Sequence, residues 1–415
     1  MLATASMITL LIEAYDLSVY AAMTALVIGP LFFPALSPFG ETLAAFGTFA
    51  TGFIARPIGA VLFSHIGDYY GRRLAFLASM AITGCATTGI GCLPTYNSVG
   101  SAAPLMLLLL RLVQGMASGG VGNGLLLVVE NSPIQSRVIW CSLPHAGISL
   151  GYLAANGIVA SLTSVFGARE FREWVWRVPF WLAALLVIAG LLLRKYMPES
   201  PEFVELVKEG GRASLPVVEL LRTHWETFFL TVGAFSFSPA VTQIVSVWSL
   251  AYVTGNLNID KATVIACVMV AVGLKGALLP FVAIIINRRS LRKVCLVGSC
   301  AMLFWAFPMM LLMHAGRPLF MMVSFIGAEI CLLPVSVAAT VYLVELYEPR
   351  IRSTGLTISH NFSSLIGGAL SPLIAVLLTK SDGPPLGVAV YLSAISFLGI
   401  ICLSRLPDVS NKEIG

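Results

Sequence analysis

The sequence predicts an all-α membrane protein in which twelve transmembrane helices form two pseudo-symmetric six-helix bundles. The first observation behind this prediction is composition: hydrophobic residues make up 58% of the 415 positions and charged residues only 11%. A soluble domain carries about 25% charged residues, so this chain lacks the charge to coat a water-facing surface. The second observation is a series of long apolar runs, and the third is one long polar stretch midway along the chain.

Twelve runs are long enough to cross a bilayer, because a spanning helix needs about 20 mostly apolar residues. The mean hydropathy of the whole chain, +0.90, agrees with this. In the first half we predict spans at residues 5–33, 43–65, 74–93, 104–128, 138–164 and 179–194. In the second half we predict spans at residues 226–254, 262–286, 294–314, 319–344, 354–379 and 387–405.

The polar stretch divides the chain into two halves. It contains the segments PESPEF and KEGGRAS and has six predicted spans on either side. Two halves with equal numbers of spans are typical of secondary transporters built from repeats. We therefore predict an N-terminal bundle of residues 1–194, a cytoplasmic linker of residues 195–225, a C-terminal bundle of residues 226–405 and a short cytoplasmic tail of residues 406–415.

The distribution of basic residues predicts the orientation in the membrane. If the N-terminus is cytoplasmic, sixteen of the 25 lysines and arginines fall in inside loops, six in outside loops and three within spans. Cytoplasmic loops of membrane proteins carry the excess of positive charge, so both termini are expected in the cytoplasm. No cleavable signal is apparent, and a short cytoplasmic segment is expected ahead of the first span.

The same sequence argues against several function classes. The basic residues are spread between apolar runs rather than gathered in a tail or on one face, which disfavours a nucleic-acid partner. The eight cysteines lack paired metal-ligand spacing, so no metal site is predicted. A P-loop, a clustered nucleophile and an acid–base set are all missing from the pattern. We predict a protein that is not an enzyme and needs no cofactor.

The first span contains two carboxylates, Glu13 and Asp16, on one helix face because they are three residues apart. Ionisable residues at bilayer depth are costly and usually face a cavity or a partner. One interpretation is that either acid carries a coupled proton, with Asp16 preferred because it lies deeper. The other is that each is a structural partner of Arg56 or Arg111. The sequence leaves both open.

Arg56 and Arg111 are candidate substrate anchors, because a guanidinium matches a carboxylate with two parallel hydrogen bonds. For Arg56, which precedes Pro57, we favour a packing and kink element, and for Arg111 a functional role. In the second half, Lys275 and Glu329 are isolated charges within spans, and we predict that they pair across the cavity or contact the substrate.

Two histidines lie at corresponding places in the fifth and eleventh predicted spans, His145 and His360. A histidine can relay protons near neutral pH, although a hydrogen-bonded packing role is the more common one. The glycines of the segment GGVGNG, residues 119–124, lie in an apolar helix, where they favour close helix contact rather than phosphate binding.

The loop after the second span reads SHIGDYYGRR over residues 64–73. It resembles the signature loop G-x-x-x-D-x-x-G-R-R of the major facilitator superfamily, with serine at the first glycine. The equivalent loop in the second half, residues 287–293, lacks the acid, the glycine and one arginine. The first loop offers an acceptor to a neighbouring helix start, which we expect near Ser353. The resemblance implies a conformational latch formed by Asp68, Gly71, Arg72 and Arg73.

Further motifs resemble the metabolite:proton symporter branch of this superfamily, which includes shikimate, α-ketoglutarate, citrate and proline/betaine transporters. Two departures stand out: Val121 occupies the place of an acid usual in the fourth helix, and Ala14 that of an aromatic in the first. Lys275 matches no motif of the family and is a candidate to compensate for the missing acid. The matching segments are IEAYD (12–16), FIARPIGA (53–60), RLVQG (111–115), WRVPF (176–180), ESPEF (199–203), ELYEPRIRSTG (345–355) and GGALSPL (367–373).

The resemblance implies secondary active transport in a bacterial inner membrane. The expected activity is proton-coupled symport of a small metabolite, an organic acid or zwitterion, by alternating access between the two bundles. The expected partners are the substrate, protons and the lipid bilayer, and a monomer is the usual state of this fold. The alternatives are a drug or metabolite:proton antiporter and a transport-incompetent sensor descended from a symporter.

Overall fold

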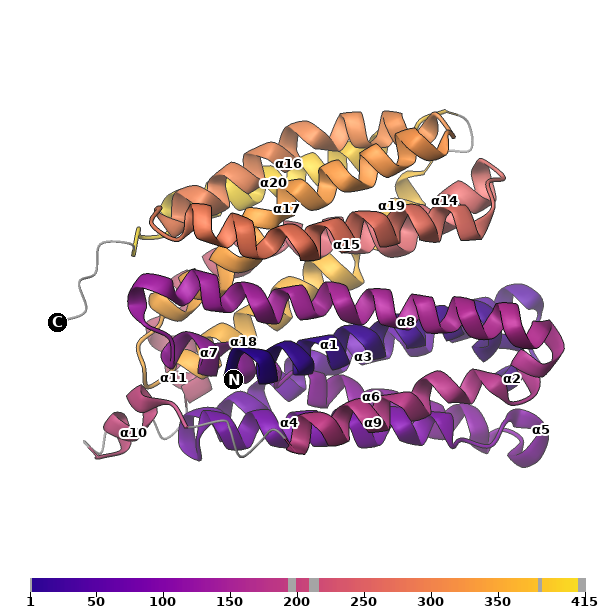
Figure 1. The fold of residues 1–415 in the computed structure, drawn as a ribbon, viewed down its shortest axis with the longest axis horizontal. Helices are drawn as coiled ribbons and strands as arrows, with labels where there is room; N and C mark the ends of the chain where they lie inside the picture. Colours follow the sequence, from indigo (N-terminus) through magenta and orange to yellow (C-terminus); the bar gives the residue numbers. More distant parts are fainter. Residues whose placement is uncertain (1, 193–198, 209–215, 380–382, 410–415) are drawn as a thin grey trace.

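The computed structural model describes residues 2–192, 199–208, 216–379 and 383–409, and every regular element in these ranges is a helix. The long helices lie side by side along the longest axis of the molecule, with most of the N-terminal half below and most of the C-terminal half above in Figure 1, where α18 (Arg352–Ser363) lies among the lower helices. The prediction of an all-α architecture in two bundles is confirmed.

The N-terminal half consists of long helices joined by tight turns. The fourth predicted span is interrupted at residues 119–121, where α6 gives way to α7. The helices are α1 (Leu2–Met23), η1 (Thr24–Ile28), α2 (Gly29–Phe32), α3 (Pro38–Tyr69), α4 (Arg72–Gly91), α5 (Tyr96–Val99), α6 (Ala102–Ser118), α7 (Gly122–Glu130), η2 (Ile134–Ser136), α8 (Arg137–Glu173), η3 (Val175–Arg177) and α9 (Val178–Leu192).

The C-terminal half repeats this plan. Its seventh and eleventh spans each contain a π-helical turn, as the first span does. The helices are α12 (Trp225–Phe235), α13 (Phe237–Gln243), η5 (Ile244–Trp248), α14 (Ser249–Asn256), α15 (Lys261–Ile286), α16 (Leu291–His314), α17 (Pro318–Leu346), α18 (Arg352–Ser363), η6 (Ser364–Ala369), α19 (Ser371–Leu378) and α20 (Leu386–Arg405).

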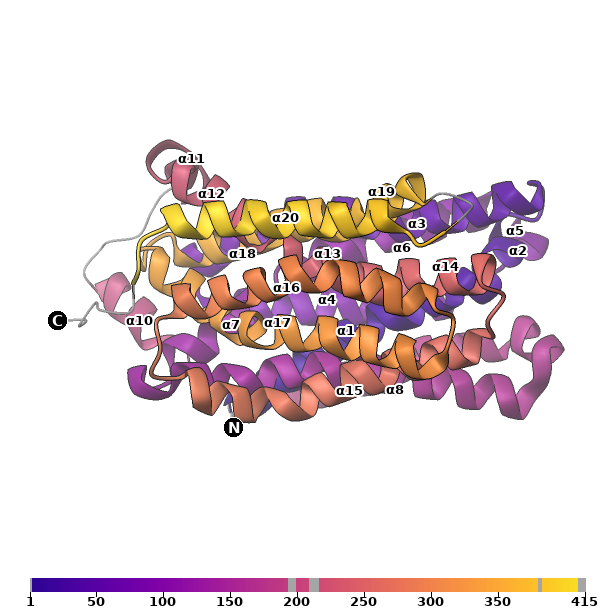
Figure 2. The ribbon, with the colours of Figure 1, turned by 90° about the horizontal axis from the view of Figure 1, so that it is seen from above.

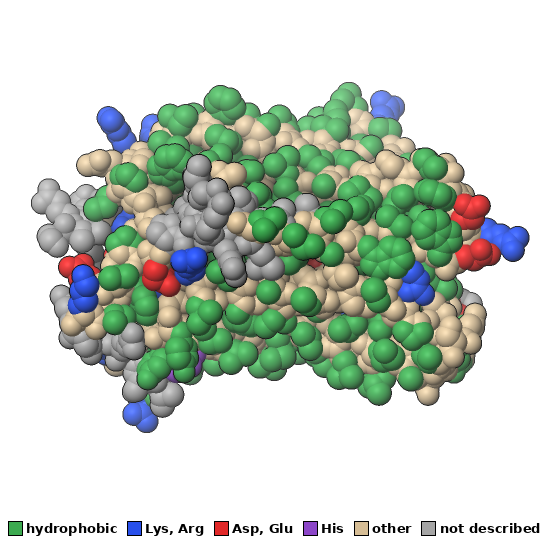
Figure 3. Space-filling view, turned by 60° about the horizontal axis from the view of Figure 1, so that its bottom comes forward, with side chains coloured by type: hydrophobic (Ala, Val, Ile, Leu, Met, Phe, Trp, Pro, Cys, Tyr) green, Lys and Arg blue, Asp and Glu red, His purple; other side chains and the backbone are tan. Residues whose placement is uncertain are grey.

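Eleven helical segments of the described chain are long and apolar enough to cross a membrane. The remaining predicted span, 179–194, corresponds to α9, and the apolar stretch there, Val175–Leu185, begins in η3 and is shorter than the other eleven. The residues that follow α9, 193–198, lie outside the described ranges. Figure 3 shows a face covered largely by hydrophobic side chains, with charged side chains mostly towards the two ends. That distribution suits a body surrounded by lipid.

The two halves meet in two main places. In the first, α8 packs against α15 and α17, and in the second, α3 packs against α18. Figure 2 shows α8 and α15 side by side along most of their length. These three contacts bring segments more than a hundred residues apart onto one interface.

Two short helices of the linker, α10 (Pro201–Lys208) and α11 (Pro216–Thr223), lie at one end of the molecule, which we call the linker end (Figure 1). The predicted linker, 195–225, includes residues 195–198 and 209–215, which lie outside the described part of the chain. The predicted domain boundaries therefore stay predictions, although α12 begins at Trp225, one residue from the predicted start of the second bundle.

Candidate functional site

The ionisable residues singled out in the spans come from seven different helices of both halves. In the N-terminal half, α1 carries Glu13 and Asp16, and α3, α6 and α8 carry Arg56, Arg111 and His145. In the C-terminal half, α15, α17 and α18 carry Lys275, Glu329 and His360. Since each of these helices crosses the bundle, the side chains gather near its centre only through tertiary packing.

Glu13 and Arg56 form an ion pair. The Arg56 Nη2 donates to Glu13 Oε1 at 3.1 Å, and 18% of the Glu13 side chain and 8% of the Arg56 side chain remain exposed. The Arg56 guanidinium also lies over the ring of Phe53, 5.0 Å from its centroid. Glu13 and Arg56 are thus paired, as expected if Glu13 is a structural partner of Arg56.

Asp16 is held in a buried chain of hydrogen bonds. Thr87 Oγ1 donates to Asp16 Oδ1 at 2.6 Å, and Gln114 Nε2 donates to Asp16 Oδ2. Gln114 Oε1 in turn accepts from Arg111 Nη1. Asp16 and Arg111 are therefore linked through an amide rather than in direct contact. Neither Gln114 nor Thr87 was singled out from the sequence, because uncharged polar residues in a span give no distinctive signal.

Arg111 is buried, and its hydrogen-bond donors bind groups of the N-terminal half. Its Nε and Nη2 donate to the carbonyl oxygens of Thr48 (3.4 Å) and Phe49 (3.2 Å), and its guanidinium lies 3.7 Å from the centroid of the Tyr20 ring. Only 2% of the residue is exposed. In this arrangement Arg111 stabilises the surroundings of Asp16, and its predicted role as a substrate anchor stays a prediction.

Lys275 and Glu329 form the second ion pair, with Lys275 Nζ donating to Glu329 Oε2 at 2.8 Å. Because α15 and α17 are neighbours within the C-terminal half, the pair lies within one bundle and does not bridge the two halves. The predicted pairing is present, and the predicted position across the cavity is wrong. The Lys275 side chain is 15% exposed and that of Glu329 only 4%.

The two predicted histidines have different surroundings. His145 Nε2 shares a hydrogen bond of 3.0 Å with Thr340 Oγ1, which connects α8 to α17 of the other half. His360 is exposed to solvent although it lies within a predicted span. The role of the two histidines as a proton relay remains a prediction.

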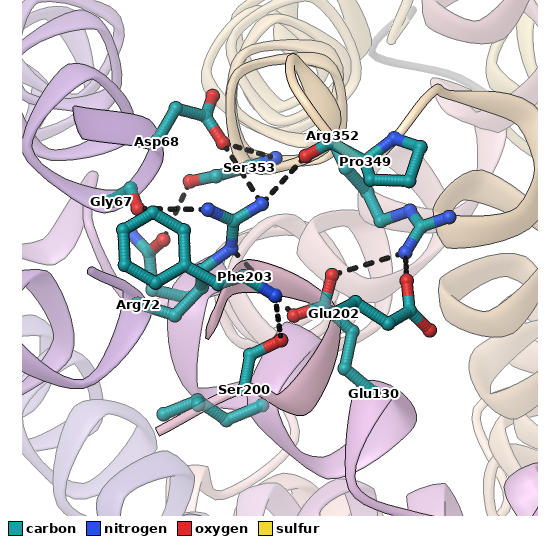
Figure 4. A network of polar contacts seen from close by, with 12 residues as sticks. Gly67, Asp68, Arg72, Glu130, Ser200, Glu202, Phe203, Pro349, Arg352 and Ser353 are labelled. Atoms are coloured by element: carbon teal, nitrogen blue, oxygen red, sulfur yellow. Dashed lines mark hydrogen bonds and ion pairs between the residues drawn. The ribbon is translucent and has the colours of Figure 1, made fainter. Parts of the chain in front are cut away.

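At the linker end, Asp68 caps the start of a helix in the other half. Its carboxylate accepts from Ser353 N (3.2 Å), Thr354 N (2.9 Å) and Thr354 Oγ1 (2.7 Å) at the beginning of α18. A carboxylate at a helix N-terminus satisfies free amide groups and interacts favourably with the helix dipole. Figure 4 shows Asp68 aimed at Ser353. The predicted contact thus joins the N-terminal and C-terminal halves.

Arg72 extends this contact, as Figure 4 shows. It lies 3.4 Å from Asp68, donates to Pro349 O at 2.7 Å and packs over the ring of Phe203, 4.7 Å from the centroid. Gly71 has a φ of +123°, a conformation that L side chains rarely adopt, which explains the glycine. The fourth residue of the predicted latch, Arg73, donates its backbone N–H to the carboxylate of Glu199 in the linker at 3.2 Å.

The sequence reasoning missed the carboxylate at the centre of this network, Glu130. It accepts from Arg352 Nη1 at 3.1 Å and lies 3.6 Å from Arg72 Nε. Arg352 also donates to Glu202 of the linker. Because Glu130 stands at the end of an apolar run, the sequence gives it the ordinary appearance of a loop acid.

A repeat in the two halves could have revealed this network. Glu130 is followed seven residues later by Arg137, and Glu345 is followed seven residues later by Arg352. Each arginine reaches the glutamate of the other half: Arg352 lies 3.1 Å from Glu130, and Arg137 lies 4.0 Å from Glu345. The pseudo-symmetry of the fold therefore produces two crossed ion pairs between the halves.

The corresponding loop of the second half makes weaker contacts. Asn287, at the position of Asp68, donates to the carbonyl oxygen of Gln135 before α8. Ser290 Oγ donates to Asp408 of the C-terminal segment at 2.7 Å. A neutral amide thus replaces the carboxylate that caps the helix in the first half, in keeping with the degraded motif.

Val121, at the place of the acid expected from the resemblance, packs with Leu10 and Leu125 in a small apolar cluster. The neighbouring glycines lie against other helices: Gly119 against the Arg56 carbonyl oxygen of α3, and Gly122 against Thr357 of α18. The glycines of this segment permit close helix contact, as the sequence analysis expected.

Comparison with known proteins gives a consistent result. The family model described as Major Facilitator Superfamily matches residues 7–372. The inner membrane metabolite transport protein YhjE of Escherichia coli (strain K12) is 33% identical over 418 residues, which cover 99% of this chain and 94% of that protein. The shikimate transporter of the same strain is 31% identical over 389 residues, which cover 92% of this chain and 89% of that protein.

A further relative is the proline/betaine transporter of Salmonella typhimurium, 29% identical over 419 residues, covering 97% of this chain and 82% of that protein. Among solved structures, the proton:xylose symporter XylE bound to 6-bromo-6-deoxy-D-glucose superposes with a TM-score of 0.81. The superposition covers 98% of this chain and 95% of the symporter chain, and the two sequences are 12% identical. This likeness shows the fold.

Proposed function

Because the chain belongs to the major facilitator superfamily and its relatives are metabolite transporters, we propose that it is a proton-coupled symporter of a small metabolite. The substrate is an organic acid or a zwitterion, and the two bundles expose the central site alternately to each side of a bacterial inner membrane. The linker end faces the cytoplasm in this proposal, in agreement with the excess of basic residues in its loops.

The observation that carries the proposal is the buried Asp16 carboxylate. It has neutral donors, Thr87 and Gln114, instead of a directly bonded cation, so protonation leaves no arginine without its partners. Gln114 connects it to Arg111, which lets a change of charge at Asp16 alter the contacts of the N-terminal helices. Such a carboxylate can accept a proton from one side and release it on the other.

The linker-end network supports the conformational part of the proposal. It contains the latch residues Asp68, Gly71, Arg72 and Arg73 and the crossed pairs that join the halves. In the conformation described, these contacts close the linker end. Alternating access then requires them to break when the central site opens to the cytoplasm, so the network sets the free-energy difference between the two conformations.

Uptake into proteoliposomes tests the proposal. Labelled mono-, di- and tricarboxylates, shikimate and glycine betaine are screened with and without an imposed proton gradient. We expect gradient-driven accumulation of one class, its loss in Asp16→Asn, and retention of substrate exchange in that variant. The matched control is Glu226→Gln, which removes an exposed acid at the start of α12.

Each contrary result has a distinct meaning. Accumulation that persists in Asp16→Asn contradicts the assignment of the coupling acid. Flux that is independent of the gradient contradicts symport, and substrate export driven by inward proton flow identifies an antiporter. The absence of flux for every compound supports the transport-incompetent sensor.

A further inference from the structure

The charged groups at the centre of the molecule balance one another. Three carboxylates, those of Glu13, Asp16 and Glu329, face three cations. Two of these cations are in direct ion pairs, Arg56 with Glu13 and Lys275 with Glu329. The third, Arg111, is linked to Asp16 through Gln114. No cation of this group is left without an acid, so an anion that enters the centre adds an uncompensated charge.

From this balance we infer that Lys275 and Glu329 form the subsite for a single carboxylate of the substrate, which enters the centre together with one proton. The inference rests on the proposed function and adds the substrate class. In the empty carrier Glu329 occupies one donor of the Lys275 ammonium. A substrate carboxylate takes another donor of the same group, and protonation of one of the three acids restores the balance.

The geometry of Lys275 favours this role. An ammonium has three donors, and in the described part of the chain Glu329 is the one hydrogen-bond partner of Lys275. The Lys275 side chain is 15% exposed and that of Glu329 is 4% exposed, so the cation is the more accessible group of the pair.

The position of the pair also fits a site between the bundles. Gly276, next to Lys275, lies against Ser149 of α8 in the other half. About one turn from Ser149 along α8, on either side, are His145 and Tyr152. No hydrogen-bond partner of the Tyr152 hydroxyl is found among the described residues, which leaves a neutral donor for the substrate.

Glu329 lies on α17, and the helices that pack against α17 include α7, α8, α13, α15, α16 and α18. Helix α13 has no ionisable residue, and α16 between Val294 and Met313 has only two cysteines. Among the other helices, α15 carries Lys275, α8 carries His145 and Tyr152, and α18 carries His360.

Electrostatics then sets the substrate class. Charges interact strongly in a poorly hydrated protein interior, and an unpaired buried charge is costly. A singly charged carboxylate needs one proton, and a dicarboxylate needs two. A zwitterion adds no net charge and needs none. If one proton enters with each substrate, as proposed, the substrate that keeps the site balanced is a monocarboxylate, and its transport with one proton moves no net charge across the membrane.

Proton linkage tests the inference in the purified full-length carrier. Binding of labelled shikimate, succinate and glycine betaine is measured against pH. We expect shikimate to bind more tightly than the other two, and its affinity to fall about tenfold per pH unit at high pH, because one proton is taken up on binding. In Glu329→Gln the site has one excess positive charge, so shikimate affinity is retained and becomes independent of pH.

A double variant separates binding from folding. Lys275→Met/Glu329→Gln removes both charges, avoids an unpaired buried charge and keeps the centre neutral, so it is expected to fold and to lose shikimate binding. Equal affinity of this variant and the wild type overturns the inference, as does the absence of monocarboxylate binding by the wild type. Proton-driven uptake of glycine betaine overturns the inference while leaving the proposed symport intact. Shikimate uptake that ignores a proton gradient contradicts the proposed function instead.

Discussion

At the scale of single residues, Asp68 is the group that we propose holds the linker end closed. Its buried carboxylate accepts three hydrogen bonds from the start of α18 and lies 3.4 Å from Arg72. Hydrogen bonds to a charged group contribute about 1.5–3 kcal/mol each. The corresponding Asn287 of the other loop has no charge to offer, so the two loops stabilise the closed end unequally.

Asp68→Asn is therefore expected to open the linker end more often. The native Cys141 reports this opening, because it is buried on α8 one turn from Arg137. We expect its labelling by a maleimide to become about tenfold faster in the variant, corresponding to the loss of one charge-assisted hydrogen bond. Cys295, buried on α16, is the internal control and keeps its rate. Unchanged labelling of Cys141 contradicts the latch.

At the scale of helices, glycines determine how closely α3 approaches α6. Gly59 lies against the Met116 carbonyl oxygen, Gly115 against that of Gly52, and Gly119 against that of Arg56. Small residues of this kind allow backbones to come together where apolar burial between helices gives no driving force in lipid. The same contact fixes Arg56 and Arg111, one on each helix, in their positions near the centre.

Gly115→Ala tests this contact, since the added methyl group meets the backbone of α3. We expect a lower midpoint of thermal unfolding in detergent, by several degrees, because overpacking costs about 1–3 kcal/mol. The control is Gly157→Ala on α8, where an added methyl group meets no atom within 4 Å. It is expected to keep or slightly raise the midpoint, since alanine is the better helix former. Equal effects of the two variants contradict the packing argument.

The positions of the spans were predictable because span length and hydropathy follow directly from the bilayer. The pairing of charges was harder to predict. Lys275 and Glu329 are 54 residues apart, and their apolar surroundings indicate depth but not the direction in which each side chain points. The prediction of a pair was right. Its placement across the cavity was wrong because the sequence does not show that α15 and α17 are neighbours.

Other features were hidden for physical reasons. Gln114 and Thr87 are neutral and inexpensive to place in a span, so nothing marks them as partners of Asp16. Glu130 stands where an apolar run ends, a position at which acids are common. Its role depends on Arg352, which is 222 residues away. Comparison of the two halves exposes it, because the spacing of Glu130 and Arg137 recurs at Glu345 and Arg352.

At the scale of the whole molecule, the two bundles are joined by α8 with α15 and by α3 with α18, while the linker end carries the ionic contacts between them. Interfaces of this kind have two discrete arrangements because packed surfaces do not deform continuously. The central claim is that transport requires the bundles to separate at the linker end and to close again.

A disulfide between the bundles tests this claim most directly. A Cβ placed at Gly122 lies 3.5 Å from the Thr357 Cβ, within the range for a disulfide, so Gly122→Cys/Thr357→Cys joins α7 to α18. The control is Gly233→Cys, whose Cβ lies 3.7 Å from that of the native Cys402 and which joins α12 to α20 within one bundle. The measurement is proteoliposome uptake before oxidation, after it and after reduction. We predict that the cross-link between the bundles abolishes uptake reversibly and that the cross-link within one bundle does not, whereas full uptake by the oxidised first variant would contradict alternating access.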